Sequence, residues 1–139
     1  MDDLCLYIAP GEIYGFIGHN GAGKTTTIKC ILNLIRRDSG EIRLLGRDNI
    51  QEERLVKQDI GLVLDECFFH DTLRASDVER ILRPAYQNWD SGLFHEYLEK
   101  FKRPERQFIK EYSRGMKMKL SLAAALAYHP SLLVLDEAT

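Results

Sequence analysis

Two short stretches of this sequence carry residue types that suit phosphate chemistry. The first is GHNGAGKT at positions 18–25, which fits the pattern GxxxxGK[ST]. Its glycines let the backbone wrap closely enough for N–H groups to point at phosphate oxygens. In such a loop Lys24 reaches the β- and γ-phosphates, and the hydroxyl of Thr25 suits Mg²⁺. The residues expected to bind the nucleotide are Gly18, Asn20, Gly21, Ala22, Gly23, Lys24, Thr25 and Thr26.

The second stretch is LLVLDE at positions 132–137, an apolar run that ends in two adjacent carboxylates. Open α/β sheets bind ligands at the carboxyl ends of their strands. We expect Asp136 to hold the Mg²⁺ shell and Glu137 to act as the general base that polarises the attacking water. An apolar strand ending in Asp-Glu is common and is often only a solvated strand end. Its pairing with the glycine-rich loop favours the chemical interpretation.

The elements around these stretches predict an α/β fold with a mainly parallel sheet. A short apolar run over 12–17 predicts a buried strand before the glycine-rich loop. After the loop, apolar residues with helical spacing predict a helix from about Gly23. These residues are Ile28, Ile31, Leu32 and Ile35. Further apolar runs over 42–45, 60–64 and 132–135 predict three more strands.

A mainly helical stretch separates the last two predicted strands. One helix is predicted to carry Val78, Ile81, Leu82 and Ala85 on one face and to end near Pro84, and a second to carry Phe94, Tyr97, Leu98 and Phe101. A third is predicted over about 114–128, with Ser113 as its cap and His129-Pro130 as its end. We expect residues 72–128 to form a helical subdomain inserted within a single domain that covers 1–139.

Composition limits the other classes of protein. The net charge of −2 gives no overall basic field of the kind that attracts nucleic acid. The basic segment over 100–119 is the one feature that favours a nucleic acid, but no aromatic platform is interleaved with it. The three cysteines show no paired or metal-ligand spacing, which fits a reducing cytosol. The longest mostly apolar run, over 120–128, is too short to span a bilayer, so membrane attachment would come through a partner.

The order of these motifs resembles the ABC ATPase family over nearly the whole chain. The glycine-rich loop is followed by the apolar run at 60–64, a helical insert, the stretch YSRGM at 112–116 and the Asp-Glu strand. The stretches FFHDTL at 68–73 and QNWD at 87–90 are similar to bacterial exporters of the ABC-2 type. The resemblance implies a P-loop NTPase fold and hydrolysis of ATP with Mg²⁺, with Glu137 and Lys24 as catalytic residues.

The resemblance also implies partners and a location. Two nucleotide-binding domains, in a homo- or heterodimer, would enclose two ATP molecules and drive transmembrane permease subunits. The protein would then be cytoplasmic and peripheral at the inner face of the cell membrane. The chain would be an incomplete domain, because the family's adenine-stacking aromatic residue and its γ-phosphate-sensing histidine are expected outside residues 1–139.

Two motifs depart from the family pattern. YSRGM stands where the family usually has Leu-Ser-Gly-Gly-Gln, but it keeps Ser113 and Gly115, which the resemblance implies bind the γ-phosphate held by the other protomer. At the family's glutamine loop the expected Gln is replaced by Asp65, a potential Mg²⁺ ligand, followed by Glu66. A solvated acidic turn, or a shift by one residue to Glu66, is the alternative there.

Two rival functions stay open at this stage. One is an ABC ATPase that acts on ribosomes or DNA and not in transport, which the basic segment alone favours. Such proteins usually carry tandem cassettes or a long coiled coil, and the 66–111 stretch has no sustained heptads. The other is a nucleotide sensor that does not hydrolyse ATP, suggested by the altered YSRGM motif. Turnover measurements separate hydrolysis from sensing.

Overall fold

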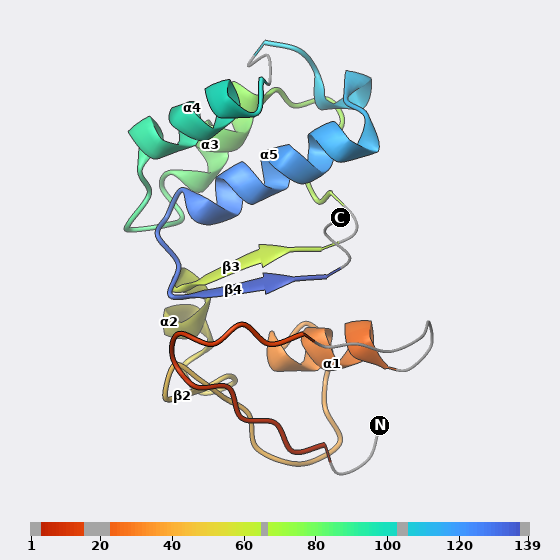
Figure 1. Cartoon of the computed structure of the whole chain (residues 1–139), viewed down its shortest axis with the longest axis vertical. Coiled ribbons are helices and arrows are strands. Elements are labelled where there is room, and N and C mark those ends of the chain that lie inside the picture. The colour runs from red at the N-terminus through yellow and green to blue at the C-terminus, as the bar shows by residue number, and fades with distance from the viewer. Residues whose placement is uncertain (1–3, 16–22, 65–66, 103–105, 137–139) are drawn as a thin grey trace.

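The chain combines helices and strands in an α/β fold (Figure 1). The computed structural model describes residues 4–15, 23–64, 67–102 and 106–136. The helices are α1 (Lys24–Ile31), α2 (Glu53–Gln58), α3 (Ala75–Leu82), α4 (Ser91–Lys100) and α5 (Arg114–Leu126), with a 3₁₀ turn at Ile109–Glu111. The strands are β1 (Arg43–Leu44), β2 (Arg47–Asp48), β3 (Ile60–Val63) and β4 (Leu132–Leu135).

Strands β3 and β4 form the parallel pair that the sequence predicts. Ile60 lies opposite Leu132 and Val63 opposite Leu135, and the backbone N–H of Asp136 continues the ladder to Val63 O at 2.9 Å. The crossover between the two strands contains α3, α4 and α5. Because the strands are parallel, both of them end at the same edge of the sheet. This edge is where Leu64 and Asp136 lie.

The sheet lies between α1 on one side and α5 on the other (Figure 1). On the α1 side, Leu32, Val56 and Ile60 form a buried cluster against which Ile28 packs. On the α5 side, Gly61 lets the helix approach closely. A Cβ atom at Gly61 would lie 3.1 Å from Ala125 O and 2.9 Å from Leu133 Cδ1. A bare backbone at this position therefore sets the spacing between β3 and α5.

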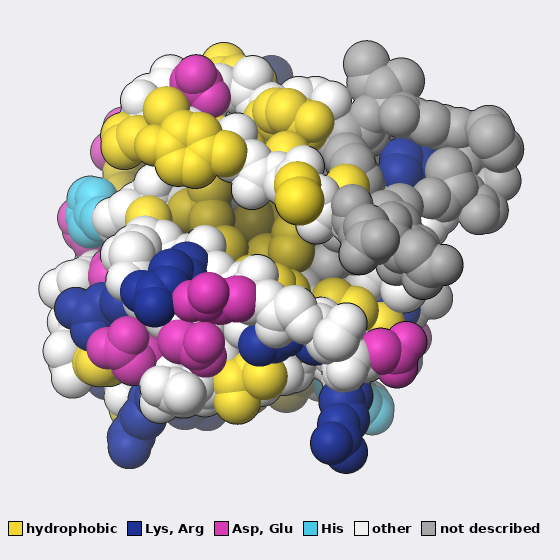
Figure 2. Space-filling model, turned by 90° about the horizontal axis from the view of Figure 1, so that it is seen from below, with side chains coloured by type: hydrophobic (Ala, Val, Ile, Leu, Met, Phe, Trp, Pro, Cys, Tyr) yellow, Lys and Arg dark blue, Asp and Glu magenta, His cyan; other side chains and the backbone are white. Residues whose placement is uncertain are grey.

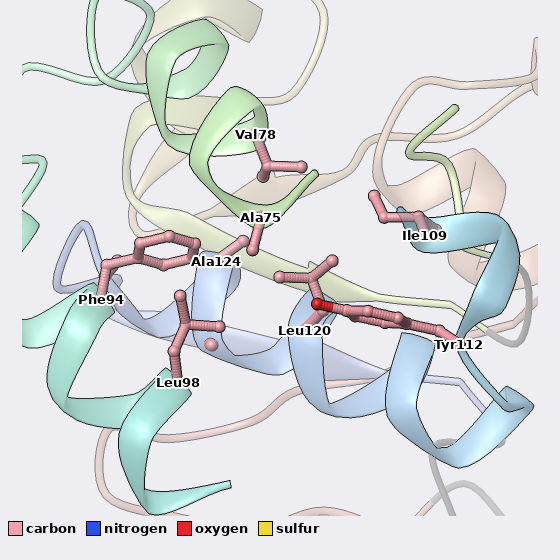
Figure 3. Packing of buried hydrophobic residues seen from close by; sticks show 10 residues of the cluster. Ala75, Val78, Phe94, Leu98, Ile109, Tyr112, Leu120 and Ala124 are labelled. Carbon is pink, nitrogen blue, oxygen red and sulfur yellow. The ribbon is translucent and has the colours of Figure 1, made fainter. Parts of the chain in front are cut away.

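The largest buried cluster joins the three helices of the crossover (Figure 3). It contains Ala75, Val78, Phe94, Leu98, Ile109, Tyr112, Leu120, Ala123, Ala124 and Ala127. The predicted face of α4 is confirmed, since Phe94 and Leu98 are buried in this cluster. The face predicted for α3 is confirmed only in part: Val78 is buried and Leu82 packs against the cluster, but Ile81 is 55% exposed and Ala85 lies beyond the end of the helix. The predicted end at Pro84 is also confirmed, since α3 stops at Leu82.

The helix starts follow from their caps. The carboxylate of Asp90 accepts a hydrogen bond from the backbone N–H of Leu93 at 2.9 Å, and His129 lies 3.1 Å from its other oxygen. The bond from Leu93, together with that from His129, holds the pKa of Asp90 below its usual value. Ser113 Oγ accepts from Met116 N at 3.2 Å, as predicted for the start of α5.

The strand predicted over 12–17 is wrong in the part that the structure describes. Residues 12–15 form no strand, and Ile13 is fully exposed. The run has the apolar composition of a buried strand, but a strand also needs a neighbour that takes up its backbone hydrogen bonds. Within the described part of the chain, no strand pairs with it. Residues 16 and 17 lie outside the described ranges.

The strand predicted over 42–45 is shorter than expected and belongs to a hairpin. Leu45 and Gly46 have φ angles of 55° and 77°, so the chain turns and β2 pairs antiparallel with β1. Two consecutive positive φ angles match the two-residue turns that join hairpin strands. The sequence analysis did not predict β2, α2 or the 3₁₀ turn. Of the described helices, none is long and apolar enough to cross a membrane.

Candidate nucleotide-binding site

The N-terminal end of α1 has the geometry of an anion-binding site. Gly23 lies directly before the helix with φ 87°, in the left-handed region that favours glycine. Its carbonyl accepts the backbone N–H of Thr27 at 2.9 Å and the Thr27 hydroxyl at 2.7 Å, which closes the first turn. The N–H groups of a first helical turn have no acceptor inside the helix, and this end of a helix favours an anion. Lys24, Thr25 and Thr26 occupy this turn.

Among the described residues, a hydrogen bond joins the two stretches that were paired from the sequence. Thr25 Oγ1 donates to Asp136 Oδ2 at 3.0 Å across 111 residues of sequence. Thr25 is exposed on the first turn of α1, whereas Asp136 is 7% exposed directly after β4. The parallel register and the crossover bring the end of β4 next to the start of α1. A hydroxyl and a carboxylate thus meet at the edge of the sheet.

This oxygen pair fits a magnesium ion. Mg²⁺ is a hard cation that prefers oxygen ligands and is usually held by one or two carboxylates together with substrate phosphates. Asp136 offers the carboxylate, Thr25 the hydroxyl, and the adjacent helix start favours the phosphates. Within the described ranges, no cluster of three or more histidine, cysteine or acidic side chains offers a separate metal site.

Several predicted site residues lie outside the described residues. They are Gly18, Asn20, Gly21, Ala22, Asp65 and Glu137, together with the alternative Glu66. Each of these stretches adjoins a described residue. Gly23 follows the first group, Leu64 precedes Asp65, and Asp136 precedes Glu137. The roles of these residues stay predictions.

Ser113 and Gly115 lie apart from the Thr25–Asp136 pair. Both are exposed at the N-terminal end of α5, which lies on the other side of the sheet from α1 (Figure 1). Open space surrounds the Cα of Gly115, because a Cβ there would have no neighbour within 4 Å. Within one chain, the structure therefore does not bring the two groups of residues together. This separation is compatible with a role toward a second protomer.

The sequence analysis missed two polar contacts of α1. The hydroxyl of Thr27 bonds Gly23 at the start of the helix, and the side chain of Asn49 bonds the carbonyls at its end. The sequence signal for the first contact is the residue type, because the hydroxyl of a threonine in a helix can bond the carbonyl three or four residues earlier. No sequence signal points to the second, since Asn49 follows a hairpin that was not predicted.

Comparison with known proteins assigns the chain to a family. The model of the family described as "ABC transporter" matches residues 1–139. The chain belongs to the ABC transporter family. The chain is 36% identical over 139 residues to the ABC transporter ATP-binding protein YtrB of Bacillus subtilis, and covers 47% of that protein. It is 34% identical over 141 residues to the bacitracin transport ATP-binding protein BcrA of Bacillus licheniformis, and covers 46% of it.

The fold of this ABC family member is also that of solved structures. A structure of the ATP-binding subunit of an ABC transporter superposes with a TM-score of 0.76 at 26% identity, over 88% of this chain and 53% of that one. The P-loop NTPase fold predicted from the motifs is thereby confirmed. The chain spans about half the length of the curated relatives it matches, since all of it aligns with 46–47% of theirs.

Proposed function

We propose that this chain is the nucleotide-binding part of a subunit that hydrolyses ATP to power transport across a membrane. The observation that carries the proposal is the 3.0 Å contact between Thr25 and Asp136. It joins the helix that follows the glycine-rich loop to the strand that ends in two carboxylates. Membership of the ABC family supports the choice of ATP.

Each candidate residue has a role in this proposal. Gly18 and residues 20–26 bind the phosphates, with Lys24 next to the β- and γ-phosphates. Thr25, Asp136 and Asp65 hold Mg²⁺, which shields the phosphate charge. Glu137 accepts a proton from the water that attacks the γ-phosphorus, while the bond from phosphorus to the bridging oxygen breaks and ADP leaves. Ser113 and Gly115 contact the γ-phosphate held by a second protomer.

An apolar pocket supports the proposal that the chain binds a membrane subunit. The pocket of about 180 Å³ lies between β3, the end of α3 and α5. Phe68, which is 70% exposed, lines it together with Phe69, Tyr86 and Tyr128. Burial raises the pKa of the Tyr128 hydroxyl, which donates to Ile60 O at 2.7 Å, so the pocket wall is fixed and uncharged. A short apolar segment of a permease subunit fits such a surface.

The relatives support transport in the same sense. BcrA carries bacitracin transport in its name, and YtrB is an ABC transporter ATP-binding protein. The partner permease, the transported substrate and the peripheral location at the inner membrane face are parts of the proposal. Their test is co-purification of the protein with a membrane subunit and stimulation of its ATPase activity by that subunit.

Turnover of ATP tests the enzymatic part of the proposal. In a protein that carries these residues at the length of the relatives, Glu137→Gln should lower the rate by about two to four orders of magnitude, the usual scale for loss of a general base. Binding of MgATP should persist in the same variant. Wild-type protein that binds MgATP without turnover would instead favour a nucleotide sensor, and turnover stimulated by nucleic acid would favour the ribosome or DNA function.

A further inference from the structure

Asn49 is a deeply buried polar residue whose side chain belongs to neither of the proposed motifs. It is 2% exposed and directly follows β2. Its backbone N–H donates to Ile42 O at 3.1 Å, which extends the β1–β2 hairpin by one more bond. A buried amide needs partners for its donors and its acceptor. The partners of Asn49 show what the hairpin is attached to.

The side chain of Asn49 caps the C-terminal end of α1. Its Nδ2 donates to Cys30 O at 3.1 Å and to Ile31 O at 2.8 Å. Cys30 O also accepts from the backbone N–H of Asn33 at 3.1 Å, so the amide adds a second bond there. The last carbonyls of a helix have no intrahelical donor, and the bond to Ile31 O supplies one from outside the helix. Asn49 Oδ1 accepts from Arg37 Nη1 at 2.9 Å, and Arg37 Nε donates to Gly40 O at 2.9 Å. Both the nitrogen and the oxygen of the side-chain amide are therefore hydrogen-bonded.

These hydrogen bonds constrain the position and orientation of α1. The helix also rests on apolar contacts, in which Ile28 packs against Leu32, Val56 and Ile60. Apolar burial is non-directional and permits a small rotation or slide, whereas hydrogen bonds constrain both distance and angle. The helix has only eight residues, so a shift at its C-terminal end moves its N-terminal end as well. That end carries Gly23 and Thr25.

We propose that Asn49 is a positioning residue for nucleotide binding, which holds α1 so that its first turn and Thr25 stay in register with Asp136. The inference rests on the proposed function for its link to ATP. The side-chain hydrogen bonds of Asn49 go to Arg37, Cys30 and Ile31, none of which is a proposed phosphate- or metal-binding residue. Asn49 acts through the helix, from the end opposite the Thr25–Asp136 contact.

Two substitutions separate the donors of Asn49 from its volume and its acceptor. Asn49→Asp has nearly the same shape and keeps an acceptor for Arg37, but it loses both donors and sets a negative charge beside the helix carbonyls. Asn49→Ala removes all three bonds. Val78→Ala is the matched control, because Val78 is equally buried but lies in α3 within the helical cluster (Figure 3).

Two measurements are made on each variant: hydrogen exchange of the α1 amides relative to those of α5, and MgATP affinity by calorimetry. We expect both Asn49 variants to speed α1 exchange and to weaken MgATP binding by about tenfold, the scale of one or two hydrogen bonds. Val78→Ala should lower the unfolding temperature without either effect.

Two outcomes would contradict the inference. Unchanged α1 exchange and affinity in Asn49→Asp would overturn it, as would equal losses in Val78→Ala, since these would reflect general stability. Should Asn49→Ala fail to fold, Asn49→Asp and Arg37→Ala still decide, the latter with a smaller loss in the same direction. Wild-type protein that binds no MgATP contradicts the proposed function, and α1 exchange then decides the anchoring role alone.

Discussion

Lys24 opens α1 directly after the left-handed Gly23, at the end of the helix that suits an anion. Lys24→Ala should remove a charge-assisted contact worth about 1.5–3 kcal/mol and abolish most nucleotide binding. Lys29→Ala is the control, because Lys29 lies in the last turn of the same helix. Calorimetry with MgATP measures both. Affinity retained in Lys24→Ala, or lost equally in both variants, would count against the phosphate-binding role.

Asp136 offers a second test at the scale of single residues. Asp136→Asn keeps the shape of the side chain and an acceptor for Thr25, but it removes the negative charge that a magnesium ion needs. The affinity for ATP should therefore depend less on Mg²⁺ than in the wild type. The exposed Asp38→Asn is the control, and its Mg²⁺ dependence should be that of the wild type. Titrations with and without Mg²⁺ measure the ratio, and an unchanged ratio in Asp136→Asn contradicts the metal role.

How well the residues could be predicted depends on what fixes them. The chemistry of phosphate and magnesium dictates residue types and spacing, so the Thr25–Asp136 pair was found from the sequence before any geometry. Asn49 is fixed by a tertiary contact between a hairpin and a helix 18 residues earlier, and its type alone also fits a solvated turn. A single sequence carries no sign of that contact.

Among the elements, those with a regular apolar period were predicted best. Strands β3 and β4 lie where the short apolar runs placed them, and helices α3, α4 and α5 lie where the helical period placed them, because these helices bury apolar residues against one another. The run over 12–17 failed because apolar composition does not supply a pairing partner. The β1–β2 hairpin was missed because its strands are only two residues long and show no alternation.

Gly61 allows a test of how closely the elements must pack. Gly61→Ala would place a Cβ 2.9 Å from the side chains of Leu133 and Pro130, and 3.1 Å from the backbone at Ala125. We expect a loss of about 1–3 kcal/mol in the free energy of unfolding, as for other overpacked sites. Gly92→Ala in α4 is the control.

A Cβ at Gly92 would meet Asp90 at an ordinary 3.4 Å. Gly92→Ala should raise the free energy of unfolding by about 0.5–1 kcal/mol, because alanine has a higher helix propensity than glycine. Urea unfolding of the two variants beside the wild type gives both values. Equal stability of the two variants would show that α5 can move away from β3 at no cost, against the close packing described above.

At the scale of the whole molecule, the separation of the two predicted groups needs an explanation. Ser113 and Gly115 stand at the start of α5 on one side of the sheet, whereas Thr25 stands at the start of α1 on the other side, so one copy of the chain does not enclose the γ-phosphate with all of them. Two copies arranged head to tail by a two-fold axis can do so, each offering its α5 start to the phosphates of the other. By resemblance to the ABC family, we expect this arrangement.

Mixing two inactive variants tests the two-copy site. Lys24→Ala spoils the phosphate loop and Ser113→Arg spoils the start of α5, so each variant alone forms only damaged sites. In a random pairing of equal amounts, half of the dimers are mixed, and each mixed dimer has one intact and one doubly damaged site. The mixture should therefore show about a quarter of the wild-type ATPase rate.

The assay uses a protein of the relatives' full length, and a mixture of Lys24→Ala with Glu137→Gln is the control. Both of those changes damage the same half of a site, so their mixture should stay inactive. Recovery in the control, or none in the test mixture despite demonstrated exchange of subunits, would contradict a site built from two copies.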